Sequence, residues 1–332
     1  KYGYFDRKKQ NVSGWPVTPG QEQLWRLQQR PHQQSAYHLF YVHDLPEDCT
    51  FNHLKEAVKR LAERHASLRT VFVEHDGQIW QNIKKINEID FIVEEWDHSE
   101  LEAQSAKQQI DTFKETSFDL GSAPLFRVAL RRDENGQKQA VWVLHHIIGD
   151  AWSFALLEKE LIQLINGEQL APLEIQYYDY ATWLNAKLSA EEAKNMRFWE
   201  KRLDGESARL NLPATRQRPR LFNAKGVMVQ HFLSPEKAER LGVMADEREI
   251  TLFHLMVSLF SLMLFDITGQ KPRFGVVVNT RHNRATQDLI GYLVNTLLFS
   301  TPIDQNQHLK DHLETVKAEM VQLWDHSEFP FQ

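Results

Sequence analysis

Two adjacent histidines that follow a run of strand-forming residues are the side chains in this chain best suited to chemistry. Residues 140–144 (AVWVL) lead directly into His145 and His146. Imidazole is the side chain that most readily gains and loses a proton near neutral pH. Because side chains alternate along a strand, only one of the two histidines can face a cleft while the other packs inward. The segment therefore indicates a single histidine available for acid–base chemistry.

A turn and an amphipathic helix follow the histidines. Gly149 and Asp150 form the expected turn, and the helix begins near residues 151–153. Asp150 is well placed to hold the structure, either by capping the helix or by pairing with a charge. A purely structural interpretation stays open, because an aspartate is a common helix cap and a chain with 15 histidines can place two side by side by chance.

Several other kinds of chemical site are not indicated. Adjacent histidines on a strand cannot both point at one metal ion, and no third ligand lies nearby, so no metal site is predicted. The single cysteine, Cys49, allows neither an internal disulfide nor a cysteine cluster for zinc, and it favours a reducing, cytoplasmic location. The sequence contains no glycine-rich phosphate loop, nucleophile elbow or His-Glu-x-x-His helix.

The elements that must position the histidines alternate between helical and strand-like patterns, which predicts an α/β or α+β fold. Predicted strands cover residues 37–42, 68–73, 79–83, 91–96, 125–131, 139–146, 226–232, 273–279 and 295–301. Predicted helices cover residues 21–29, 51–64, 101–116, 152–166, 177–188, 191–203 and 308–324, with two more between the strands at 226–232 and 273–279. Asp76 and Gly77 predict a hairpin turn between the second and third strands.

The chain has 332 residues, which is long enough for two lobes that each bury a core. We expect an N-terminal extension at 1–15, a first lobe at 16–172 and a second lobe at 173–332, with the polar run at 166–172 as the boundary. A net charge of −6 argues against nucleic acid as the main partner. The apolar run at 250–265 is shorter than the roughly 20 residues that a bilayer requires, so it predicts a buried core helix and no membrane span.

Six segments resemble the core motifs of nonribosomal peptide synthetase condensation domains, and they occur in that family's order. Residues 144–153 (LHHIIGDAWS) are similar to the motif HHxxxDG. The other five segments are residues 18–25 (TPGQEQLW), 64–72 (RHASLRTVF), 177–183 (YYDYATW), 290–296 (IGYLVNT) and 326–332 (HSEFPFQ). Related acyltransferases share the histidine motif, whereas the joint match of all six segments in order is a strong resemblance to the synthetase domains.

The resemblance implies a fold of two chloramphenicol-acetyltransferase-like lobes in a V-shaped pseudo-dimer, with the histidines in a tunnel between them. It implies that the amine of an acceptor aminoacyl thioester attacks a donor acyl or peptidyl thioester to form an amide. Donor and acceptor peptidyl carrier proteins would bring these substrates on phosphopantetheine arms, so the domain would need no cofactor of its own. Neighbouring synthetase domains are further implied partners, and we expect a monomeric domain within a larger megaenzyme.

The resemblance also assigns roles by motif position. It assigns catalysis to His146, either as a base or by orienting the amine, and structural support to His145. It implies that Asp150 forms an ion pair with Arg281. The other assigned positions are Gly149, Ala151, Trp152 and Ser153 as support around the histidines, Arg64 and Arg69 as structural arginines, and Tyr292 and Asn295 as tunnel-lining residues.

The chain departs from the family pattern at some positions. Ala151 stands where the motif has glycine, and its methyl group is expected to narrow the acceptor channel and to disfavour glycine-only backbone angles. The chain stops at the last motif, so we expect the second lobe to lack its final segment. The pair Trp152 and Ser153 resembles domains that join an L-configured donor to an L-configured acceptor.

Two alternatives of other classes stay open at this point. One is a catalytically silent domain that recruits carrier proteins or tailoring enzymes, although the intact His146 argues against it. The other is a free-standing acyltransferase that uses a soluble thiol donor, although the full motif series argues against it. The basic residues Arg216, Arg218 and Arg220 are a candidate contact for acidic carriers, but a solvated loop is the simpler explanation. The identities of donor and acceptor are not legible from the sequence.

Overall fold

The computed structural model describes residues 14–30, 35–96, 103–203, 210–214 and 229–330. The chain divides into two compact units. The first unit contains Lys1–Ser189 and Arg281–Val294, and the second contains Ala190–Thr280 and Asn295–Gln332. A segment late in the sequence therefore belongs to the first unit. The lobe boundary expected between residues 172 and 173 stays a prediction.

A four-stranded sheet forms the centre of the first unit. Its strand order is β2 (His38–Asp44), β7 (Lys138–His145), β6 (Phe126–Arg132) and β5 (Val93–Glu95). Neighbouring strands are antiparallel except β5 and β6, which are parallel. The register between β2 and β7 sets His38 directly opposite His145, where β2 begins and β7 ends. The histidine pair thus lies at one end of the sheet.

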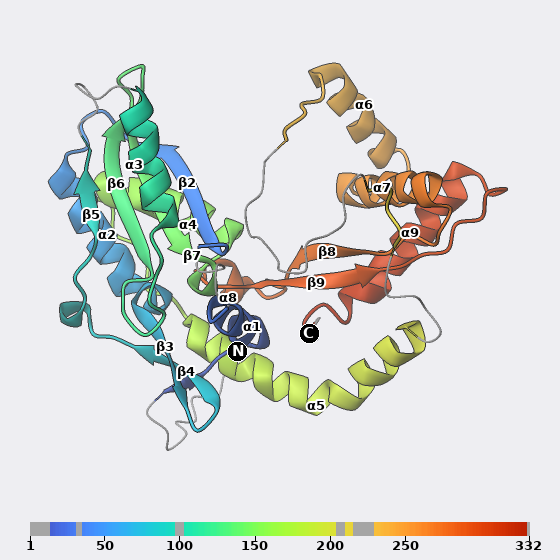
Figure 1. Cartoon of the computed structure of the whole chain (residues 1–332), viewed down its shortest axis with the longest axis horizontal. Helices are drawn as coiled ribbons and strands as arrows, with labels where there is room; N and C mark the ends of the chain where they lie inside the picture. Colours follow the sequence, from blue (N-terminus) through green and yellow to red (C-terminus); the bar gives the residue numbers. More distant parts are fainter. Residues whose placement is uncertain (1–13, 31–34, 97–102, 204–209, 215–228, 331–332) are drawn as a thin grey trace. The chain divides into compact units, whose positions relative to one another are not determined.

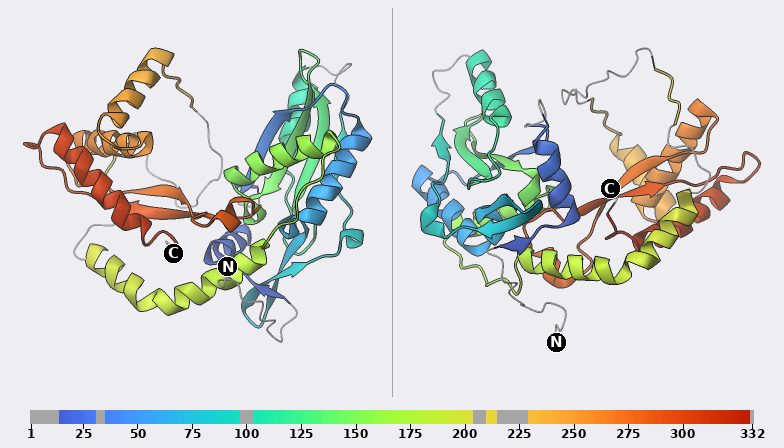
Figure 2. Two further views of the ribbon diagram at one scale, coloured as in Figure 1. Left: turned by 180° about the vertical axis from the view of Figure 1, so that it is seen from behind. Right: turned by 60° about the horizontal axis from the view of Figure 1, so that its bottom comes forward.

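Helices cover both faces of this sheet. Helix α3 (Ala103–Glu115) lies over one face, and α2 (Phe51–Arg64) and α4 (Ala151–Ile165) pack together over the other (Figures 1 and 2). A strand between two covered faces needs apolar side chains in both directions. Residues 140–145 of β7 are accordingly all buried. Packing on both faces of the sheet therefore fixes the strand that leads into the histidine pair.

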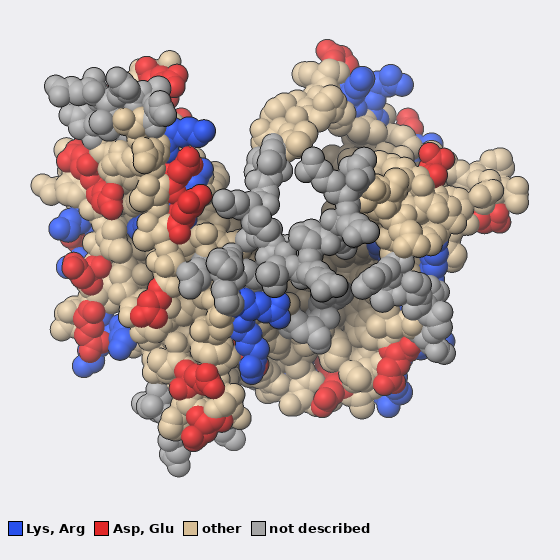
Figure 3. Space-filling view, in the orientation of Figure 1, with Lys and Arg blue, Asp and Glu red and all other residues tan. Residues whose placement is uncertain are grey.

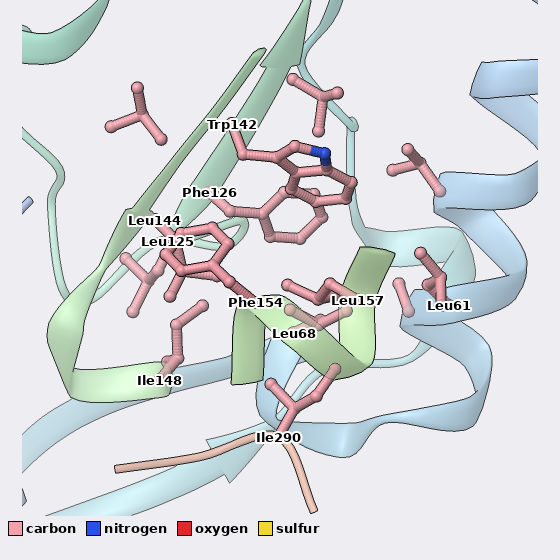
Figure 4. Packing of buried hydrophobic residues seen from close by; sticks show 14 of the residues in the cluster. Leu61, Leu68, Leu125, Phe126, Trp142, Leu144, Ile148, Phe154, Leu157 and Ile290 are labelled. Atoms are coloured by element: carbon pink, nitrogen blue, oxygen red, sulfur yellow. The ribbon is translucent and has the colours of Figure 1, made fainter. Parts of the chain in front are cut away.

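The core beneath α2 and α4 is built around two stacked aromatic rings. The ring centroids of Trp142 and Phe126 lie 5.8 Å apart, and Leu157 of α4 and Leu61 of α2 pack in the same cluster (Figure 4). All four side chains are fully buried. Burial of a side chain of this size stabilises the fold by about 1.5–3 kcal/mol. The packing therefore anchors α4, whose first residues follow the histidine turn.

A smaller antiparallel sheet completes the strands of the first unit. Its order is β1 (Trp15–Pro16), β4 (Gln78–Ile83) and β3 (Thr70–His75). The connection between β3 and β4 is the predicted hairpin, in which Asp76 and Gly77 have φ values of 51° and 76°. Both residues adopt the left-handed conformation that a two-residue hairpin turn requires, so the prediction from the Asp-Gly pair is confirmed.

Short helical elements complete the first unit. Helix α1 (Pro19–Gln28) begins at a reciprocal cap, in which the side chains of Thr18 and Gln21 each bond the other residue's backbone amide. The remaining elements are the 3-10 turns η1 (Ala66–Arg69), η2 (Ile86–Glu88) and η3 (His146–Ile148), the helix α8 (Arg284–Gln287), and the first half of the long helix α5 (Tyr177–Leu203). Helix α1 packs against η3, which places it beside the histidine turn.

The second unit is a two-stranded sheet packed against helices. Strand β8 (Phe274–Asn279) pairs with β9 (Val294–Phe299). Helix α7 (Leu252–Thr268) packs against both α6 (Pro235–Asp246) and α9 (Leu309–Trp324). The main core of this unit joins the two strands to α7 and α9, and Phe198 and Trp199 of α5 pack against it.

Some expectations from the sequence differ from the structure. The two helices expected at 177–188 and 191–203 form the single helix α5, because the residues between them include no glycine or proline to interrupt it. Residues 229–232 form no strand, and the rest of the strand expected at 226–232 lies outside the described residues, as do Arg216, Arg218 and Arg220.

Most of the apolar run at 250–265 is helical, as expected, since α7 begins at Leu252, but the helix is buried on one face only. Leu255 and Leu264 of α7 are buried, whereas Met256 and Met263 are 47% and 46% exposed. Within the described ranges, no helix has both the length and the apolar character needed to cross a membrane.

Charges of both signs are interspersed on the described surface of the first unit that Figure 3 presents to the viewer. Opposite charges that alternate over short distances largely cancel beyond the Debye length of about 8–10 Å. The described residues on this face therefore carry no extended patch of one charge.

Candidate active site

His146 begins the turn η3 directly after β7, and its side chain is only partly buried. Its Nδ1 lies 2.7 Å from the carbonyl oxygen of Gly149. A carbonyl oxygen can only accept, so Nδ1 carries the proton and Nε2 of the neutral ring carries the lone pair. Within the described part of the chain, no group hydrogen-bonds Nε2. The turn therefore holds His146 in the tautomer that can accept a proton at Nε2.

His145 is the last residue of β7 and is fully buried. Its Nδ1 accepts the amide N–H of Ile147 at 3.1 Å, so the ring proton lies on Nε2, which is 3.4 Å from Oε1 of Gln28. Burial, together with the nearby His38 and His146, lowers the pKa of His145 to about 3. The two adjacent histidines thus hold opposite tautomers. The expectation that one histidine packs inward is confirmed, because His145 is buried and His146 only partly so, whereas a cleft beside His146 stays a prediction.

Helix α1 supports the histidine turn through Gln21, which is 1% exposed. Nε2 of Gln21 donates to the carbonyl oxygen of Ile147 at 3.1 Å, and its Oε1 accepts the amide of Thr18 at 3.1 Å. The amide of His146 donates to the carbonyl of Tyr37 at 2.8 Å. The role of Gln21 could not be predicted from the sequence, because no sequence pattern shows that a residue of α1 reaches a carbonyl 126 positions away.

Asp150 caps α4 and pairs with Arg281 in a buried network. Its carboxylate accepts hydrogen bonds from Nη1 of Arg281 at 2.6 Å and from Nη2 at 3.0 Å, and both side chains are 1% exposed. The same carboxylate accepts the amide N–H groups of Ser153 at 2.9 Å and of Leu293 at 3.1 Å. The ion pair that the resemblance implied is therefore present. It holds the segment 281–294 at the N-terminus of α4.

Ser153 adds a second link between α4 and that segment. Its hydroxyl lies 2.8 Å from Oδ1 of Asp150, to which it donates, and it accepts the amide N–H of Gly291 at 3.1 Å. Ser153 is fully buried. The Ser153 hydroxyl therefore adds a hydrogen bond to the Asp150 carboxylate. It also holds the backbone of Gly291, which belongs to the motif at residues 290–296.

Three further motif positions surround this network. Gly149 has an extended φ of −171°, and a Cβ there would lie 2.6 Å from Cδ2 of Leu144, so a larger residue would force the buried Leu144 side chain to shift. Ala151 is the first residue of α4, its side chain is exposed and its φ is not positive, so the expected conflict with glycine-only angles does not arise. Trp152 donates from Nε1 to the carbonyl of Gln287 at 2.8 Å. Narrowing of an acceptor channel by Ala151 stays a prediction.

The two residues predicted to line a tunnel have different surroundings. The ring of Tyr292 lies edge-on to His146, with centroids 4.9 Å apart and an interplanar angle of 76°. Asn295, in the second unit, donates from its side-chain amide to the carbonyls of Ser327 at 2.7 Å and Phe329 at 2.6 Å. Tyr292 thus contacts the candidate catalytic residue, whereas Asn295 fixes the C-terminal segment. A tunnel-lining role for either residue stays a prediction.

The two motif arginines make contacts within the first unit. Nε of Arg64 donates to both carboxylate oxygens of Glu160 at 3.1 Å, and Nε2 of His65 lies 2.6 Å from the same carboxylate. Burial raises the pKa of Glu160, but these two partners outweigh burial and hold the pKa below its ordinary value. Arg69 donates from Nε to the carbonyl of Ala62 at 2.7 Å. Arg64 therefore ties α2 to α4, which supports the structural role that we expect.

Among the described residues, no group of three or more His, Cys, Asp or Glu side chains is arranged to hold a metal ion.

Comparisons of the sequence place the chain among peptide synthetases. The condensation-domain family model matches residues 12–332. The chain is 31% identical over 334 residues to bacitracin synthase 1 of Bacillus licheniformis, and the alignment covers 99% of this chain and 6% of that protein. It is 32% identical over 320 residues to surfactin synthase subunit 2 of Bacillus subtilis (strain 168), and this alignment covers 96% of this chain and 9% of that protein. The chain thus spans less than a tenth of the length of these relatives.

Comparisons of the structure identify the fold. A four-domain nonribosomal peptide synthetase bound to AMP and glycine matches with a TM-score of 0.83 and 21% identity, over 99% of this chain and 25% of that chain. The first condensation domain of the calcium-dependent antibiotic synthetase, in complex with a substrate analogue, matches with a TM-score of 0.82 and 19% identity, over 96% of this chain and 77% of that chain. The fold is therefore the chloramphenicol-acetyltransferase-like fold of condensation domains. With the family model matched over nearly the whole sequence, this chain belongs to the condensation-domain family of nonribosomal peptide synthetases.

Proposed function

We propose that this condensation domain joins two carrier-bound substrates by an amide bond, with His146 as its catalytic residue. The amine of an acceptor aminoacyl thioester attacks the carbonyl carbon of a donor acyl or peptidyl thioester. The carbon–nitrogen bond forms, the carbon–sulfur bond breaks, and the donor carrier leaves with a free pantetheine thiol. The acceptor carrier then holds the lengthened chain.

The single observation that supports this proposal is the fixed tautomer of His146. The hydrogen bond from Nδ1 to the carbonyl of Gly149 leaves a lone pair on Nε2. As the amine adds to the thioester, its nitrogen must lose one proton and the departing sulfur must gain one. Nε2 accepts the proton from nitrogen and returns it to sulfur, so the imidazole is unchanged after each turnover. A positioned proton acceptor of this kind contributes about 10²–10⁴-fold to a rate.

His146 need not act as a strong base. An α-amine has a pKa near 8, so roughly a tenth of it is already neutral at pH 7. The imidazole acts on the proton that becomes acidic as the tetrahedral adduct forms. Orientation of the two tethered substrates contributes through effective molarity, which reaches about 10⁵ M or more in well-oriented systems.

The proposal also specifies partners. Donor and acceptor peptidyl carrier proteins supply both substrates on phosphopantetheine arms, so this chain requires no cofactor of its own. Neighbouring synthetase domains hold those carriers, as the multidomain relatives suggest. The cytoplasm is the proposed location, since it is where a free, buried thiol such as that of Cys49 stays reduced.

The experiment loads separate donor and acceptor carrier proteins with simple aminoacyl groups and adds the chain. Intact-protein mass spectrometry then measures dipeptide on the acceptor carrier and free thiol on the donor carrier. We expect both products with the native chain and neither above background with His146→Ala.

Other outcomes distinguish the alternatives. A folded chain that binds both carriers without making dipeptide identifies a silent recruiting domain. Amide formation from a small soluble thioester, at the same rate with and without carriers, identifies a free-standing acyltransferase.

A further inference from the structure

We infer that Tyr292 is a positioning residue for the imidazole of His146, and that the glycine at position 20 is present because it admits the Tyr292 ring. The activity part of this inference rests on the proposed function, whereas its spectroscopic part does not.

The His146 ring keeps some freedom to move. Among the residues that the structure describes, the imidazole makes one hydrogen bond, from Nδ1 to the carbonyl of Gly149. A single bond permits the ring to swing about it. The edge-on ring of Tyr292, 4.9 Å away between centroids, occupies the adjacent space and restricts that swing.

Neighbouring groups fix the backbone of Tyr292. Its carbonyl accepts the hydroxyl hydrogen of Tyr177 at 2.8 Å. The amides on either side are also bonded, that of Gly291 to Ser153 and that of Leu293 to Asp150. The Tyr292 side chain can therefore respond to a new neighbour only by rotating its ring.

Gly20 lies in the first turn of α1. Its φ is not in the left-handed region, so its backbone does not require glycine. Alanine favours a helix more than glycine does, so a glycine here needs another reason. A Cβ at Gly20 would lie 2.4 Å from Cε1 and 2.8 Å from Cδ1 of Tyr292. The ring of Tyr292 thus fills the volume that a side chain at position 20 would take.

The ring contact with His146, the bonded backbone of Tyr292 and the space at Gly20 act together. Helix α1 leaves room for the Tyr292 ring, the fixed backbone aims that ring, and the ring limits the imidazole to orientations in which Nε2 stays available. Burial raises the pKa of Tyr292, so its hydroxyl is un-ionised around neutral pH and adds no charge beside the histidine.

The test uses four variants of the full chain: Tyr292→Ala, Tyr292→Phe, Gly20→Ala and the double variant with Gly20→Ala and Tyr292→Ala. Gly242→Ala is the matched control, because a Cβ at Gly242 meets no atom within 4 Å and its φ is not positive. Two readouts are taken, the imidazole ¹⁵N shifts of His146 in histidine-labelled protein and the separate values of kcat and KM for dipeptide formation. Circular dichroism establishes that each variant is folded.

We expect Tyr292→Ala to convert the His146 signals from one Nδ1–H tautomer to a mixture, and to lower kcat by about 10- to 100-fold with little change in KM. Tyr292→Phe keeps the ring, so it should restore the single tautomer and most of kcat. Gly20→Ala should reproduce the tautomer mixture in the native background and have no added effect when Tyr292 is already alanine.

Two results would overturn the inference. One is an unchanged His146 tautomer in folded Tyr292→Ala. The other is a Gly20→Ala effect of equal size in both backgrounds, which would show that Gly20 acts independently of the ring. If the chain makes no dipeptide at all, the proposed function fails, but the ¹⁵N spectra still decide whether Tyr292 positions His146. If Tyr292→Ala does not fold, Tyr292→Leu replaces it. The His146 tautomer in Tyr292→Leu then decides whether the ring positions the imidazole, and Gly20→Ala in the native and Tyr292→Leu backgrounds decides whether Gly20 acts through the ring.

Discussion

The carboxylate of Asp150 and the guanidinium of Arg281 meet through two hydrogen bonds of 2.6 and 3.0 Å, although 131 positions separate them in the sequence. Neither side chain is more than 1% exposed. Taking such a pair out of water is costly, and the mutual attraction offsets that cost only when the remaining polar atoms are also bonded. Here the amides of Ser153 and Leu293 bond the carboxylate, and Nη2 of Arg281 also donates to the carbonyl of Leu289 at 3.1 Å. The pair therefore specifies how the 281–294 segment docks on α4.

Removal of Asp150 should destabilise the first unit. Asp150→Ala leaves the guanidinium of Arg281 buried without its counter-charge, and we expect a loss of about 3–5 kcal/mol in the free energy of unfolding. Urea unfolding followed by fluorescence measures this loss. Glu47→Ala is the control, because it breaks the exposed pair with Arg132, which should contribute far less. A soluble Asp150→Ala protein with the native unfolding midpoint would contradict the prediction.

Loss of the His146 imidazole should lower the rate of the reaction without lowering the stability of the fold. We expect His146→Ala to lower the rate of dipeptide formation by about 10²–10⁴-fold, with the unfolding midpoint close to that of the native chain. Single-turnover mass spectrometry with loaded carriers measures the rate. The control is His75→Ala, since the side chain of His75 is 70% exposed in the β3–β4 hairpin. Comparable rates for the two variants would exclude His146 from catalysis.

His145 should make the stability of the fold depend on pH. Its pKa is lowered to about 3 in the folded state from 6.5 in the unfolded chain, so between these values only the unfolded chain binds this proton. The stabilisation is complete above pH 6.5 and is lost as the pH falls toward 3, by up to about 1.4 kcal/mol per pH unit.

The measurement compares the native chain with His145→Gln by urea unfolding at pH values from 7.5 to 4.5. Burial also lowers the pKa of His38 and His43, which contribute in the same direction in both proteins. The difference between the two slopes therefore isolates His145. Equal slopes would show that His145 is protonated with similar ease in both states.

Arg64 should contribute to stability without contacting substrate. Arg64→Ala removes two hydrogen bonds to the buried carboxylate of Glu160, and we expect a loss of about 1.5–3 kcal/mol in the free energy of unfolding with kcat per folded molecule unchanged. Arg26→Ala is the matched control, because its bond to Glu22 lies on the exposed surface of α1. A selective fall in kcat for Arg64→Ala, without loss of stability, would require a direct role in the reaction.

Much of the local structure could be predicted from the sequence, because short-range physics determines it. The apolar run at 140–144 specifies a buried strand, and the hairpin at Asp76 and Gly77 follows from the turn geometry that this pair favours. Asp150 was expected as a helix cap or an ion-pair partner, and it is both. The alternation of side chains along a strand also predicted that one histidine of the pair would be buried.

Only the tertiary structure decided which distant groups meet. A sequence pattern shows which face of an element is buried, but it does not show which backbone carbonyl or ring lies opposite that face. The histidine turn depends on Gln21 of α1, and the space for Tyr292 depends on Gly20. The hydrogen bond that sets the tautomer of His146 is local, because the carbonyl of Gly149 lies only three residues further on. The sequence by itself determined the family motifs and the elements that carry them. The folded chain determined how they meet, because hydrogen bonds and packing between distant segments hold the turn in which His146 lies.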